Sequence, residues 1–106
     1  MTTTNHKGDD MTTKVYFTRR EAHWIEVALC EIYGGTRAGV LQCKDRRNAF
    51  KLTKEDADDI VRTIAENAPY YVDEARGNFD AVGRSIQSAV DKVTNALNRR
   101  RVTIRW

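Results

Sequence analysis

Few residues of this sequence could do nucleophilic, acid-base or metal chemistry, and they are widely separated. The two cysteines, Cys30 and Cys43, form no CxxC pair, and the histidines, His6 and His23, lie outside any cluster with the spacing of metal ligands. Neither His23 nor Cys30 has a catalytic partner at an informative spacing, and adjacent carboxylates on a helix are usually a solvated face. We therefore expect no enzyme activity, no cofactor and no metal site, with both cysteines reduced.

Basic residues are the next candidates for chemistry, because they fall in two clusters. Residues 36–51 hold five Lys or Arg and one acid, and arginines gather again at 99–105, whereas residues 55–80 hold eight acids and two arginines. Helix dipoles explain part of this pattern, but no helix end accounts for the first cluster. That cluster is the better candidate for contacting phosphate or an acidic partner. The candidate binding residues are Arg37, Lys44, Arg46, Arg47, Lys51, Arg99, Arg100 and Arg101.

Aromatic residues extend this candidate surface. Tyr70 and Tyr71 could stack on a base beside Arg46 and Arg47, although tyrosines at a helix start more often pack beneath a loop. Trp106 has two interpretations, an exposed anchor for a partner or a strand residue that covers the core. All three aromatic residues are therefore kept as candidate partner-binding residues.

The overall composition is that of one small domain. A length of 106 residues with 41% apolar residues suffices for one modest core. The formal charge of +3 permits nucleic-acid binding without requiring it. No apolar run approaches the roughly 18 residues of a membrane span, and the first residues do not resemble a signal peptide. We expect a cytoplasmic protein with no membrane contact.

The first thirteen residues are polar and are predicted to form a disordered tail before a globular domain at 14–106. Met-Thr-Thr occurs at Met1 and again at Met11. One back-translation of residues 7–10 contains a purine-rich stretch that resembles a bacterial ribosome-binding site. Met11 is therefore a candidate for the true start, which would make the gene bacterial or from a phage. The alternative is an ordinary flexible tail with an accidental codon resemblance.

Local signals at both ends predict the first helix. Residues 18–21, Thr-Arg-Arg-Glu, form a capping box in which Thr accepts from the first turn and Glu reaches back. The apolar residues that follow keep the spacing of one helical face, and Trp24 lies at the edge of that stripe. Gly34 and Gly35 supply a C-terminal cap, so the helix should run from Arg19 to about Tyr33.

Two further helices are expected. The capping pattern recurs at 52–57, which predicts a second short helix that ends near Asn67, because Pro69 follows. This likeness is either a weak internal repeat or the common pattern of any capped amphipathic helix. From residue 72 to 99 apolar residues alternate spacings of three and four, which predicts one long helix. Its stripe could back the shorter helices or pair with a second copy through a seam of Phe79, Val82, Ile86 and Val93.

Short alternating segments predict a small sheet. Residues 15–17 have the pattern of a strand, residues 40–43 and 48–52 that of a hairpin, and residues 102–106 that of a half-buried strand that could pair with 15–17. The expected fold class is therefore mainly α (α+β). It combines two short capped helices, one long C-terminal helix and a small antiparallel sheet that includes the C-terminal strand.

Three functions remain open from the sequence. The first is a non-enzymatic binding protein that acts as an inhibitor or adaptor on a protein partner, for example a phage anti-defence or host-takeover protein. The second is a nucleic-acid-binding regulator that uses residues 37–51 and 99–105, although the two short helices are too far apart for a helix-turn-helix. The third is a protein that sequesters a small anionic nucleotide between the arginines Arg37, Arg46 and Arg47 and the two tyrosines.

Overall fold

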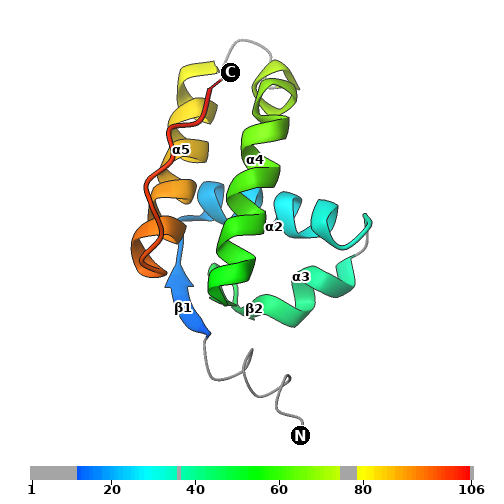
Figure 1. The fold of residues 1–106 in the computed structure, drawn as a ribbon. Coiled ribbons are helices and arrows are strands. Elements are labelled where there is room, and N and C mark those ends of the chain that lie inside the picture. Colours follow the sequence, from blue (N-terminus) through cyan, green and yellow to red (C-terminus); the bar gives the residue numbers. More distant parts are fainter. Residues whose placement is uncertain (1–11, 36, 75–78, 106) are drawn as a thin grey trace, which may run out of the picture.

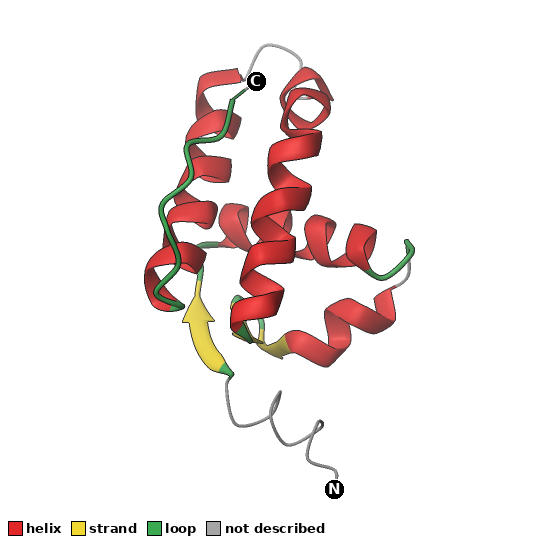
Figure 2. Ribbon diagram, viewed as in Figure 1, coloured by secondary structure: helices red, strands yellow, loops and turns green. Residues whose placement is uncertain are grey.

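The computed structural model describes residues 12–35, 37–74 and 79–105. Within these ranges the fold is mainly helical with a small antiparallel sheet, which confirms the expected fold class (Figure 1; Figure 2). The elements follow in the order β1 (Thr13–Tyr16), α2 (Arg19–Ile32), α3 (Arg37–Cys43), β2 (Lys44–Arg46), β3 (Ala49–Leu52), α4 (Lys54–Glu74) and α5 (Phe79–Ala96). The tail up to Met11 lies outside the described residues, and Thr13, which was assigned to that tail, already belongs to β1.

The predicted capping box does begin α2. The Glu21 amide donates to Thr18 Oγ1 at 3.2 Å, and the Thr18 amide donates to Glu21 Oε1 at 2.7 Å. At the other end, Gly34 and Gly35 have φ angles of 73° and 84°, the left-handed backbone that a C-terminal cap needs. The predicted bounds of this helix are therefore confirmed to within one residue.

The predicted start of α4 is also confirmed. Its predicted end near Asn67, before Pro69, is wrong. Thr53 and Asp56 exchange amide-to-side-chain hydrogen bonds of 2.9 and 3.0 Å, as in a capping box. The helix then continues through Pro69 to Glu74. A proline inside a helix costs about 3 kcal/mol. Here Pro69 lies on the exposed side, and Tyr71 beyond it is buried, so packing after the proline offsets the cost.

The prediction of a single long helix over 72–99 is wrong. In the structure α4 ends at Glu74, and α5 begins at Phe79 and runs back beside α4 in the opposite direction (Figure 1). The spacing of apolar residues indicates which side chains face a core, but it does not indicate where the chain reverses direction between two helices. An antiparallel pair of helices can therefore carry the same stripe as one long helix.

Two of the four residues of the proposed oligomer seam lie inside the monomer. Ile86 and Val93 are 0% exposed and belong to the hydrophobic core, and Val82 packs against that core. The side chain of Phe79 lies outside the part that the structure describes. Because the monomer already buries Ile86 and Val93, these two side chains have no surface left for a second copy.

The sheet has the strand order β1-β3-β2, and all its pairs are antiparallel. The first strand is confirmed, and β3 matches the second arm of the predicted hairpin. The first arm is wrong, because residues 40–43 belong to α3 and β2 begins only at Lys44. Val40 and Cys43, three residues apart, are both buried, and this spacing places them on one face of a helix, whereas in a strand they would point to opposite faces.

The predicted C-terminal strand is absent from the described residues. Residues 102–105 instead run extended along α5 (Figure 1). The Gln87 amide takes the place of a strand partner: its Nε2 donates to the Val102 carbonyl at 2.9 Å, and the Ile104 amide donates to its Oε1 at 2.8 Å. Among the described residues, β1 pairs with no strand other than β3, and Trp106 lies outside that part of the chain.

The core lies where α2, α4 and α5 meet the inner face of the sheet. α2 crosses the antiparallel pair of α4 and α5 (Figure 1). Trp24 packs at the edge of this core, as expected, with its ring stacked on Tyr71 at a centroid distance of 5.2 Å. The largest side chains with no exposed surface are Ile25, Leu29, Val40, Phe50, Leu52, Ile60, Ile64, Ile86, Val90 and Val93.

One charged group is buried at the junction of α2 and α5. Glu21 is only 5% exposed, and its carboxylate accepts hydrogen bonds from Ser88 Oγ and, at 2.6 Å, from Lys92 Nζ. Burial by itself would raise the pKa of Glu21, but the hydrogen bonds from Lys92, Ser88 and the Thr18 amide outweigh it and lower that pKa. The carboxylate is thus ionised, and it joins the first turn of α2 to α5.

This arrangement predicts a specific pH dependence of stability. Because the folded-state pKa of Glu21 lies below the ordinary value of 4.5, its contribution is complete above that pH and is lost as the pH falls through the lowered value. We expect Glu21→Gln to lower the free energy of unfolding by about 2 kcal/mol at pH 7, and by much less in strong acid. Urea denaturation across this range measures both effects.

The matched control is Glu66→Gln, which makes the same chemical change at an exposed position of α4. It should change stability by less than about 0.5 kcal/mol at every pH. Equal losses for the two variants at pH 7 would contradict a special role for Glu21.

Candidate binding surface

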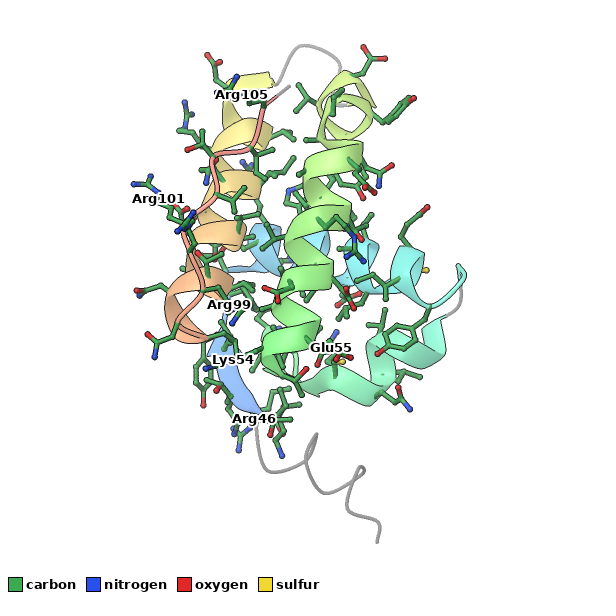
Figure 3. All side chains as sticks on the ribbon, viewed as in Figure 1. Arg46, Lys54, Glu55, Arg99, Arg101 and Arg105 are labelled. Atoms are coloured by element: carbon green, nitrogen blue, oxygen red, sulfur yellow. The ribbon has the colours of Figure 1, made fainter. Side chains whose placement is uncertain are left out.

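The C-terminal arginines are mostly engaged with acids of the same chain. Arg99 forms a two-bond ion pair with Asp58, from Nε at 2.9 Å and from Nη2 at 2.7 Å. Arg101 Nε lies 3.5 Å from Asp91 Oδ1. Arg99 thereby fastens the C-terminal segment to α4, and Figure 3 shows Arg101 and Arg105 further along the same segment. Only Arg100 of the three predicted arginines has no ion pair with a described residue.

The first basic cluster divides into structural and available cations. Lys44 Nζ lies 2.7 Å from Glu26 Oε2, which ties β2 to α2, so this lysine has a structural partner. Arg37 begins α3, and its side chain lies outside the description. Arg46 and Arg47 are exposed and form no ion pair within the described ranges. Of this cluster, those two arginines are the cations best placed to meet a ligand.

Strand alternation gathers several of these residues on one surface. The inner positions of β1 and β3 are buried, whereas Lys14, Tyr16 and Lys51 point outward. The register pairs Lys14 with Lys51, and it pairs both Tyr16 and Arg46 with Ala49 of the central strand. We call this surface, together with Arg47 of the turn that follows β2, the sheet face, and we define it by Lys14, Tyr16, Asp45, Arg46, Arg47 and Lys51.

Asp45 holds the two lysines of the sheet face together. Its carboxylate lies 2.9 Å from Lys14 Nζ and 3.6 Å from Lys51 Nζ. The hydrogen bond from Lys14 lowers the pKa of Asp45, and the same bond raises the pKa of Lys14, so both groups are charged at neutral pH. The sheet face therefore carries four cations and one anion.

Tyr16 is a candidate binding residue that the sequence analysis missed. It is 63% exposed, and it shares a cross-strand row with Arg46, on the other side of Ala49. Two strand spacings separate their backbones by about 10 Å, which long side chains can bridge. Alternation along residues 14–17, with Val15 and Phe17 inward, was the signal that could have placed Tyr16 outward beside Lys14.

The proposed nucleotide pocket of arginines and tyrosines does not form. Tyr70 lies near the far end of α4, roughly 24 Å along the helix from Lys54, which follows the sheet. Tyr71 is only 9% exposed and stacks on Trp24. Because α4 continues through Pro69, it carries both tyrosines away from Arg46 and Arg47, so Tyr70 is exposed but isolated from the basic cluster.

Among the described residues, no group of three or more His, Cys, Asp or Glu side chains is placed to hold a metal ion. Over the same residues, no helix has the length and apolar character needed to cross a bilayer.

The buried thiol of Cys43 gives a testable consequence of this packing. Both cysteines are free, and burial raises the pKa of Cys43 to about 11, with the nearby Asp56 charge adding to the effect. With Cys30→Ser to leave one thiol, we expect iodoacetamide to label native Cys43 about 100-fold more slowly than the urea-unfolded chain at pH 8. Mass spectrometry follows the labelling, and equal rates in the two states would show that Cys43 is accessible.

No protein-family model matches this sequence, and neither a curated protein nor a solved structure is significantly similar to it. The choice among functions therefore depends on the chemistry of the chain's own surface.

Proposed function

We propose that this chain is a small non-enzymatic binding protein that acts on a protein partner, as an inhibitor or adaptor, through the sheet face. The observation that carries the proposal is the placement of exposed Tyr16 in one row with Arg46, beside Lys14 and Lys51. Tyrosine and arginine are the residue types that most often dominate binding energy at protein interfaces. The partner that fits is an acidic surface with an apolar spot for the tyrosine ring.

The sheet face is held in place before any partner arrives. On its inner side Val15, Phe50 and Leu52 are buried in the core. Lys14, Asp45 and Lys51 are already linked by ion pairs across the three strands. Binding therefore needs little further ordering of the backbone, and lost conformational entropy is a main cost of association.

The pairing of charges favours a protein partner over nucleic acid. Asp45 already occupies Lys14 and Lys51, and Asp58 occupies Arg99, which leaves few cations to follow a phosphate backbone. A nucleic-acid-binding regulator is the second candidate, favoured by one observation: an exposed tyrosine among cations is the arrangement on which single-stranded bases stack. We favour a different protein over a second copy, because Ile86 and Val93 of the suggested seam are buried in the monomer.

The biological setting is part of this proposal. A bacterial or phage-infected cytoplasm is the compartment that we propose. It is supported by the resemblance of one back-translation of residues 7–10 to a bacterial ribosome-binding site, and by two cysteines that are both free thiols. Phage proteins that block host defence or redirect a host factor are the class in which such a small binding protein would belong.

The test begins with the full-length protein purified from its host lysate and examined by native mass spectrometry, followed by calorimetry with the partner so identified. We expect the double variant R46E/R47E to weaken that partner's binding at least about 100-fold, because two attractive contacts become repulsive. The melting temperature should stay nearly unchanged, since both side chains are exposed.

The matched control reverses Arg100 and Arg105, two exposed arginines outside the sheet face, and should leave the affinity unchanged. A second probe is a single-stranded DNA oligonucleotide. If it binds with a steep salt dependence that R46E/R47E abolishes, the nucleic-acid function replaces the protein-binding one. Unchanged partner binding by R46E/R47E would exclude the sheet face.

A further inference from the structure

A concave surface separate from the sheet face lies between the beginnings of α2 and α5. It is a pocket of about 470 Å³, which we call the arginine pocket, and it is lined by Arg19, Arg20, His23, Trp24, Ala81, Val82 and Ser85. None of these residues belongs to the sheet face. Its volume is within the range of small-molecule sites, about 300–1,000 Å³.

The lining combines cations with an apolar wall and contains no acid. Arg19 and Arg20 are exposed, and they form no ion pair with any residue that the structure describes. His23 adds a third group that can donate a hydrogen bond to an anion. Paired guanidinium groups bind phosphate and carboxylate well, because their planar donors match those oxygens.

The rest of the lining of the arginine pocket is largely apolar, and its indole is held in place. Trp24, Ala81 and Val82 contribute carbon surface. The Trp24 indole is held in position on two sides, because its Nε1 donates to Ser85 Oγ at 3.0 Å and its ring stacks on Tyr71. Ser85 in turn donates to the Val82 carbonyl at 2.9 Å. Both polar groups of this wall are therefore satisfied within the protein, so the wall suits an apolar, flat part of a ligand.

From this geometry we propose that the arginine pocket binds a small molecule in which an anionic group, phosphate or carboxylate, is joined to a flat ring. A nucleoside monophosphate has this chemistry, with its phosphate on Arg19 and Arg20 and its base against Trp24 and Val82. The site differs in every residue from the arginine and tyrosine pocket that the sequence suggested. It is also independent of partner binding through the sheet face.

Trp24 provides the readout. In the variant Trp106→Phe the indole of Trp24 is the only one in the chain, so a change in fluorescence reports on the arginine pocket. The probes are adenosine 5′-monophosphate, benzoate, neutral adenosine and inorganic phosphate, each titrated into the full chain. We expect the monophosphate or benzoate to shift the emission of Trp24 with a Kd below about 1 mM, and adenosine to bind at least tenfold more weakly.

The decisive variant is R19Q/R20Q, which should weaken binding of the anionic probe at least about tenfold and remove the increase in melting temperature that the probe causes. Its matched control is Arg84→Gln, an exposed arginine of α5 outside the lining, which should bind as the parent does. Phosphate is the preferred group if adenosine monophosphate binds more tightly than benzoate, and carboxylate if the order is reversed. Either order supports the proposal.

Three results would overturn the proposal. One is the absence of any change up to roughly 10 mM of every probe. Another is equal binding of inorganic phosphate and the monophosphate, which would leave no role for the flat ring. The third is an equal loss in R84Q and R19Q/R20Q, which would indicate general charge attraction. Failure here is distinguishable from failure of the proposed function, because R46E/R47E should leave probe binding intact and R19Q/R20Q should leave partner binding intact.

Discussion

A carboxylate that leaves water needs hydrogen bonds in place of its hydration shell, and Glu21 obtains them from two helices. Its own first turn supplies the Thr18 amide, and α5 supplies Ser88 and Lys92, which lie one helical turn apart. Each missing donor would leave a buried charge partly unsatisfied. The position at which α2 begins on α5 is therefore constrained by polar geometry as well as by apolar packing.

Both candidate surfaces depend on that junction. Only Phe17 separates Thr18 from the end of β1, so the start of α2 also constrains where Tyr16 and its end of the sheet face lie. On the other side of the same junction, Arg19, Arg20 and His23 are brought opposite Ala81 and Val82 to make the arginine pocket. A small domain thus uses one buried ionic group to place two separate groups of exposed cations.

The distribution of charge along the chain differs from the distribution on the molecule. Along the sequence, the arginines at 99–105 and the acids at 55–80 look like separate patches. In space, Arg99 lies on Asp58 with two hydrogen bonds, so opposite charges that are far apart in sequence neutralise each other. Lys14 and Asp45 behave in the same way across the sheet. Arg46 and Arg47 on the sheet face and Arg19 and Arg20 in the arginine pocket are among the arginines without such partners, and they remain available for ligands.

Sequence by itself determined the features whose interactions span only a few residues. The caps at Thr18 and Thr53, the glycine cap at Gly34, and the strand before Thr18 all depend on groups within one turn or one alternation, so their residues predict them directly. The clustering of basic residues at 36–51 likewise singled out the arginines at 46 and 47, but it did not predict which residues surround them.

Only the tertiary structure decided which long-range surfaces meet. The reversal between α4 and α5, the capture of the C-terminal segment by Gln87, and the stacking of Tyr71 on Trp24 all join residues distant in the chain. Tyr16 and Arg46 become neighbours through a strand register, and Arg19 and Val82 through helix packing. An apolar stripe indicates which residues favour a buried position, and a run of charged residues indicates which favour water or an opposite charge. Which partner each residue meets depends on the whole fold. Many pairings compete, and the native set is the one whose contacts together give the lowest free energy.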